Sequence, residues 1–171
     1  MADEAAQKPR VKAENNPWYL LATLYGQPTL EDDALRARNR TAWNRYMARA
    51  LTKEARTALL ARKGHPADEL TPFSDKELHA IERAFAERHR QAACTGDTAI
   101  PNPLASNVID FSGVDFDHPV FAGGFIFPDL RADFRGATFS KQAVFRGATF
   151  SGGPASGARP SDPWSRSLMR K

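Results

Sequence analysis

The stretch DFRGATFS at residues 133–140 recurs as VFRGATFS at residues 144–151, eleven residues further along the chain. Around both copies a five-residue unit repeats, consisting of a small or β-branched residue, a polar residue, Phe, a polar residue and often Gly. An internal repeat of this kind indicates that the C-terminal part of the chain is built from similar units stacked on one another. The units that fit the pattern begin at Ile109, Val114, Ala132, Ala137, Ala143 and Ala148.

The spacing within the unit suits an extended backbone with regular corners. Alternate side chains of a strand point to opposite faces, so each Phe and the residue two before it face the same way, while the polar residues face outward. A Gly at the fifth position suits a sharp corner, and Gly113, Gly136, Gly147 and Gly152 supply it. The predicted inward set is Phe111, Phe116, Phe134, Phe139, Phe145 and Phe150 with Ile109, Val114, Ala132, Ala137, Ala143 and Ala148.

These units resemble the pentapeptide-repeat family in its Phe-centred variety, over roughly a quarter to a third of the chain. The resemblance implies a right-handed quadrilateral β-helix, with one pentapeptide on each face and four in each coil. The sequence departs from the pattern by a step of seven from Phe127 to Phe134 and a step of six from Phe139 to Phe145. Residues 119–131 also fit loosely, so the coil register stays open there.

An array of about two coils is short, because solenoids generally need about three layers and capped ends. We expect the N-terminal helices to cap the first coil. The other end would pair with a second copy or with a partner, or the chain is a truncated relative of longer proteins.

Four helices are expected before the repeats, from capping residues followed by apolar residues at helical spacing. Their starts are Asn16 with Pro17, the acidic run at residues 31–33, Thr52, and Ser74 in a capping box with Glu77. The predicted fold is α+β, in five segments. These are a disordered arm (1–15), a basic helical region (16–94), a linker (95–104), a pentapeptide-repeat β-solenoid (105–152) and a flexible tail (153–171).

Basic residues outnumber acidic ones by 24 to 20, and many of them cluster in residues 36–63. Such a cluster could contact nucleic-acid phosphates, with Trp43 and Tyr46 as stacking groups. However, Arg is a good helix former and both aromatic residues fall on the expected core face, so a solvated helix face is the favoured interpretation. The candidate phosphate-contacting residues are Arg38, Arg45, Arg49 and Arg56. The resemblance also suggests a role as a mimic of DNA, which would need an acidic solenoid. This role is disfavoured, because basic residues nearly balance the acidic residues of the repeats.

The sequence offers little for catalysis. It has no nucleotide-binding, nucleophile or zinc-protease motif, and its single cysteine, Cys94, rules out an intramolecular disulfide. Asp115, Asp117 and His118 could suggest acid/base or metal chemistry, but outward corner positions favour ordinary solvated residues. His89 with Cys94 is likewise a weak metal signal. We therefore expect no enzymatic activity, catalytic residue, cofactor or metal.

The N-terminus lacks the apolar run of a signal peptide, and no stretch is long enough to span a membrane, so a cytoplasmic protein without membrane contact is expected. The expected function is that of a protein-interaction or scaffold module acting through the solenoid surface, with an unidentified protein partner. The alternative is nucleic-acid association through the arginine-rich helices. The residues expected on the outward surface are Asp110, Ser112, Asp133, Arg135, Thr138, Ser140, Arg146, Thr149 and Ser151.

Overall fold

The computed structural model describes residues 9–62, 64–92, 99–106, 108–128 and 131–150. Helices come first in the chain and short parallel strands follow, which confirms the predicted α+β class. The expected flexible tail, Gly152 and Cys94 lie outside the described residues. No helix in the described parts of the chain is long and apolar enough to cross a membrane.

Four α-helices form where the capping residues predict them, namely α1 (Pro17–Ala22), α2 (Asp33–Met47), α3 (Lys53–Ala61) and α4 (Asp75–Gln91). Asn16 Oδ1 accepts a hydrogen bond from the Tyr19 backbone N–H at 3.0 Å, and Thr52 caps α3 in the same way. Ser74 and Glu77 form the predicted capping box at the start of α4. Short 3-10 turns lie between the helices, at η1 (Ala13–Asn15), η2 (Ala48–Ala50) and η3 (Ala67–Leu70).

The strands are arranged in two layers. The first layer consists of β2 (Val108–Asp110), β3 (Val114–Phe116), β4 (Val120–Phe121) and β5 (Ile126–Phe127). The second layer consists of β6 (Arg131–Asp133), β7 (Thr138–Phe139), β8 (Ala143–Val144) and β9 (Thr149–Phe150). Each strand of the first layer pairs in parallel with the strand 23 residues later, as Asp115 does with Thr138 and Val120 with Ala143.

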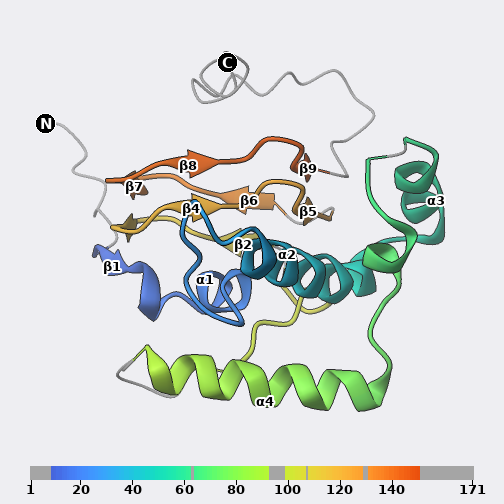
Figure 1. Ribbon diagram of the computed structural model, residues 1–171, viewed down its shortest axis with the longest axis horizontal. Coiled ribbons are helices and arrows are strands. Elements are labelled where there is room, and N and C mark those ends of the chain that lie inside the picture. Colours follow the sequence, from blue (N-terminus) through green and yellow to red (C-terminus); the bar gives the residue numbers. More distant parts are fainter. Residues whose placement is uncertain (1–8, 63, 93–98, 107, 129–130, 151–171) are drawn as a thin grey trace, which may run out of the picture.

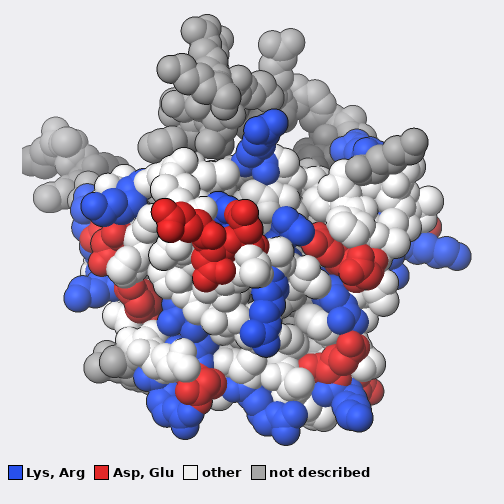
Figure 2. Space-filling view, viewed as in Figure 1, with Lys and Arg blue, Asp and Glu red and all other residues white. Residues whose placement is uncertain are grey.

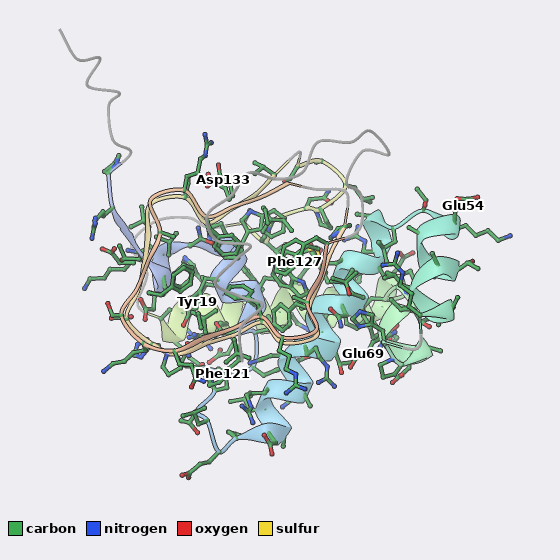
Figure 3. The ribbon with its side chains drawn as sticks, turned by 90° about the horizontal axis from the view of Figure 1, so that it is seen from above. Tyr19, Glu54, Glu69, Phe121, Phe127 and Asp133 are labelled. Atoms are coloured by element: carbon green, nitrogen blue, oxygen red, sulfur yellow. The ribbon has the colours of Figure 1, made fainter. Side chains whose placement is uncertain are left out.

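The layers and the helices form successive tiers (Figure 1). The second layer lies furthest from α4, the first layer comes next, and α1 and α2 lie between the first layer and α4. Seen from above, the two layers nearly superimpose as one closed outline, with Phe127 and Tyr19 inside it and Asp133 on its outer side (Figure 3). One hydrophobic core therefore connects the helices to the strand layers.

Residues 119–131, which fit the repeat loosely, complete the first layer and start the second. In the register of β4 and β8, Ala122 stands opposite Phe145. The step of six therefore occurs at the same place in both layers, between Phe116 and Ala122 and between Phe139 and Phe145. The five-residue steps turn through glycines with positive φ, such as Gly113 at 67° and Gly136 at 70°, a conformation that a residue with a Cβ rarely adopts.

Phenylalanine rings of the two layers stack in columns. Phe116 and Phe139 lie 4.7 Å apart between ring centroids with planes 7° apart, and the pairs Phe111–Phe134 and Phe127–Phe150 are stacked in the same manner. Phe116 is buried at 2% exposure, whereas Phe150 is 59% exposed. The rest of the predicted inward set divides by layer: Phe111, Ile109 and Val114 are buried, and Ala132, Phe134, Ala137, Phe139, Ala143, Phe145 and Ala148 are partly buried.

The column after β4 and β8 breaks the pattern, because large and small side chains exchange places there. Ala122 stands where the second layer has Phe145, and Phe125 stands where it has Ala148. Trp43 of α2 stacks on Phe125 with centroids 5.2 Å apart. A cavity of about 30 Å³ lined by apolar side chains, including those of Trp43, Ala122 and Phe145, remains beside this exchange.

Part of the expected disordered arm is ordered. Residues 11–12 form strand β1 (Val11–Lys12), which pairs in parallel with β3 on the edge opposite to β7. The Val11 N–H donates to the Gly113 carbonyl at 3.0 Å, and Ala13 is buried behind it. Two residues are too few to show a periodic pattern in the sequence. The position of β1 depends instead on its pairing with β3, about a hundred residues away.

Substitution of a stacked ring by Ala should lower the free energy of unfolding more in the first layer than in the second. Phe116→Ala is expected to lower the free energy of unfolding by about 3 to 5 kcal/mol, because it empties a fully packed site. Phe150→Ala should cost less than about 1 kcal/mol, because that ring is mostly exposed already. Urea denaturation of the variants measures both values. Equal losses at the two positions would contradict the difference in packing between the layers.

Candidate interaction surface

The inner edge of the first layer, which faces the helices, is covered by groups from the N-terminal part of the chain. Besides the pairing of β1 with β3, the Asn16 side chain donates to the Asp110 carbonyl at 2.8 Å and the Gln27 side chain to the Pro119 carbonyl at 2.9 Å. These amides take the place of a neighbouring strand, because they give partly buried carbonyl groups the donors that they need.

At β5, two adjacent residues of α2 cover the inner edge. Trp43 Nε1 donates to the Ile126 carbonyl at 2.9 Å, and Asn44 Oδ1 accepts from the Ile126 N–H at 2.8 Å. The amide group of Asn44 also donates to the Gly124 carbonyl and to Glu69. Each strand of the first layer, or a residue next to it, is therefore hydrogen-bonded to the N-terminal part of the chain.

Glu69 of η3 is a buried carboxylate, with 3% exposure. It accepts hydrogen bonds from Arg40 Nε at 3.0 Å, Thr41 Oγ1 at 3.2 Å and the Asn44 amide at 2.9 Å. A buried carboxylate is tolerated only when its charge and lone pairs are matched in this way. Glu69 thus fixes the orientation of Asn44 toward the strands, and Figure 3 places Glu69 on the α2 side of the layers.

The second layer has an outer edge, defined as the backbone edge of β6, β7, β8 and β9 that faces away from the first layer. Among the described residues, no strand pairs with this edge. His65 Nε2 lies 3.0 Å from Thr149 Oγ1 beside it, and burial lowers the pKa of His65 below its ordinary value. Among the described residues the outer edge is therefore strand backbone that no further strand covers, and the exposed ring of Phe150 lies on it; such edges are common sites of protein association.

Polar side chains on the sides of the layers bond to one another. Asp133 accepts from the backbone and guanidinium of Arg135 at 2.7–3.1 Å, and these interactions raise the pKa of Arg135. Asp110 accepts from the Ser112 N–H at 2.9 Å at the equivalent corner of the first layer. Thr138 donates to Asp115 across the layers. Ser140 and Arg146 are exposed, and Ser151 lies outside the described residues.

The four candidate phosphate-contacting arginines contact groups of the protein itself. Arg45 forms a 3.0 Å ion pair with Glu77, donates to the Thr71 carbonyl at 3.0 Å and lies over the Phe73 ring. The partners of the other three are the Tyr25 ring for Arg38, the Tyr46 ring for Arg49 and the Ala48 carbonyl for Arg56.

The two aromatic residues considered for stacking on bases are buried. Trp43 has 0% exposure and Tyr46 has 3%. The face drawn in Figure 2 mixes acidic and basic side chains and shows no continuous basic surface. Contact of the four arginines with phosphates stays a prediction.

The acidic corner residues separate into two groups. Asp115 pairs with Arg10 at 3.2 Å. Asp117 and His118 lie at the next corner, where Glu14 of η1 approaches them, although the sequence gives no sign of this contact. The pair of His89 and Cys94 falls partly outside the described residues, because Cys94 lies outside them.

A scan against protein-family models finds no match for this chain, and searches of curated proteins and of solved structures find none either.

Proposed function

We propose that this chain is a non-enzymatic pentapeptide-repeat protein and that its strand layers form a two-coil, right-handed quadrilateral β-helix. It acts as a protein-interaction or scaffold module through the surface of this β-helix. The outer edge of the second layer is the part that contacts the partner. The simplest partner is a second copy of the chain, joined edge to edge.

The observation that carries this proposal is the difference between the two edges. The inner edge is covered by β1 and by the side chains of Asn16, Gln27, Trp43 and Asn44. The outer edge has no such cover among the described residues and carries the exposed Phe150 ring. An edge of strand backbone with an apolar ring gains both hydrogen bonds and buried area when a matching layer adds to it.

Two further features support a binding role. The constant offset of 23 residues and the stacked rings make the layers rigid, so they can display side chains at regular spacing. The apolar cavity of about 30 Å³ has room for about one water molecule, which is far below the size of a typical substrate pocket.

The test is the self-association of the full chain, followed by sedimentation velocity over a concentration series. We expect a reversible dimer, and we expect Phe150→Asp to weaken it by at least about tenfold, because a carboxylate would be buried against the partner. Leu104→Asp is the matched control, since Leu104 is 60% exposed and lies before β2, away from the outer edge. It should leave the dimer intact.

Two outcomes would contradict self-association at the outer edge. One is a wild-type chain that stays monomeric at the highest soluble concentration. The other is a dimer that Leu104→Asp and Phe150→Asp weaken equally. The circular dichroism spectra of both variants must match that of the wild type, so that a change in assembly is not a change in folding.

A further inference from the structure

Three potential metal ligands from distant parts of the sequence meet at the corner between β3 and β4. Glu14 comes from η1, whereas Asp117 and His118 follow β3 directly. One ligand atom from each of the three residues lies within 4.8 Å of the other two. Pairing of β1 with β3 brings Glu14 to this corner, which is one of the corners without a glycine.

The separations between these atoms suit coordination of a small ion. His118 Nε2 lies 3.2 Å from Glu14 Oε1 and 3.6 Å from Asp117 Oδ1. Two ligands of a tetrahedral zinc ion are about 3.3 Å apart when each metal–ligand bond is about 2.0–2.1 Å. Imidazole nitrogen and carboxylate oxygen are both ligand types that Zn²⁺ takes, and a site with three protein ligands leaves a fourth position for water.

The surroundings hold the N-terminal segment in place beside this corner. On the Glu14 side, the Val11 N–H bonds to Gly113 and the Asn16 amide bonds to Asp110. Tyr19 packs against Phe116 close by, and its pKa is raised, chiefly by burial and further by the charges of Glu14 and Asp117. The ligand atoms of the Glu14 and Asp117 carboxylates lie within 4.8 Å of each other, so a cation bound between them would offset their repulsion.

We propose that Glu14, Asp117 and His118 form a binding site for a divalent transition-metal ion of the zinc class. The bound ion joins the N-terminal segment to the corner of the first layer. It stabilises the pairing of β1 with β3, because Glu14 and His118 are on opposite sides of that contact. This site is independent of the outer edge and of any partner bound there.

The experiment measures metal binding to the full-length chain without an affinity tag, in a Cys94→Ser background so that the thiol contributes no ligand. Isothermal titration with zinc sulfate should show one site per chain, and the melting temperature should rise with the concentration of zinc. Cobalt(II) should give the visible absorption of a low-coordinate complex. His118→Ala should weaken zinc binding by at least about tenfold, and Glu14→Gln should weaken it too, because each removes a ligand.

The matched control is His79→Ala, because His79 also lies 3.3 Å from a carboxylate, that of Glu82, but forms no three-ligand group with the residues that the structure describes. This variant should bind zinc as tightly as the Cys94→Ser protein. Absence of zinc binding at millimolar concentration would overturn the proposal, as would equal effects of His118→Ala and His79→Ala. In either case the contact between Glu14 and His118 would be a surface ion pair only.

Discussion

Trp43→Ala is expected to lower the free energy of unfolding by about 4 to 5 kcal/mol, the largest loss expected for a single side chain. Trp43 has 0% exposure and its ring contacts those of Trp18, Phe125 and Phe127. The substitution empties the largest packed site between α2 and the first layer and removes the hydrogen bond to the Ile126 carbonyl. Urea denaturation followed by far-ultraviolet circular dichroism measures the loss.

Trp43→Phe separates the two contributions of this side chain. It keeps an aromatic ring in the site but removes the indole N–H, so a smaller loss of about 1 to 3 kcal/mol is expected. If Trp43→Ala and Trp43→Phe proved equally costly, the hydrogen bond and not the packing would dominate. If neither lowered stability, the assignment of Trp43 to the centre of the core would be wrong.

Asn44→Ala is expected to cost about 3 kcal/mol or more, because it leaves several buried groups without partners at once. The Ile126 N–H loses its acceptor, the Gly124 carbonyl loses a donor, and the Glu69 carboxylate loses one of its hydrogen bonds. Hydrogen exchange gives a local readout in addition to denaturation. The Ile126 amide should exchange much faster than in the wild type, while amides between β3 and β7 should stay protected.

Asn39→Ala provides the comparison within the same helix. Asn39 is also buried, and it accepts from the Tyr25 N–H and donates to the Gly26 carbonyl, both at 3.0 Å. It contacts neither a buried carboxylate nor a strand edge in these bonds, so its loss should be smaller, about 1 to 2 kcal/mol. Protection at Ile126 should not change. A larger loss for Asn39→Ala than for Asn44→Ala would contradict the role given to the edge contacts.

The sequence alone predicts the features that local chemistry determines. The helix starts at Asn16, Thr52 and Ser74 follow from side-chain capping, which involves residues only three apart. The repeated Phe pattern predicts the strands β2, β3, β6, β7, β8 and β9, whereas β4 and β5 lie in the stretch that fits the pattern loosely. In these cases the residues that carry the signal are close together in the chain.

The remaining features depend on contacts between distant residues. Asn16 and Gln27 bond to strands more than ninety residues away, and a single amide in a sequence does not reveal such a partner. In the first layer the small Ala122 stands opposite Phe145 and the large Phe125 stands opposite Ala148, and Trp43 packs on Phe125. The repeat pattern alone does not predict this arrangement. Asn44, by contrast, leaves a faint sign, because a polar residue beside Trp43 on a core-facing helix needs buried partners.

The pairing of β1 with β3 also sets an order of events during synthesis. Val11 leaves the ribosome long before Val114, its partner in the register, so β1 cannot pair until about a hundred more residues have emerged. The helices and their caps form from local contacts, which are quick to close, whereas the layers depend on distant ones. We therefore expect the helices to form first, and the core that they share with the layers to close only after the repeats have emerged.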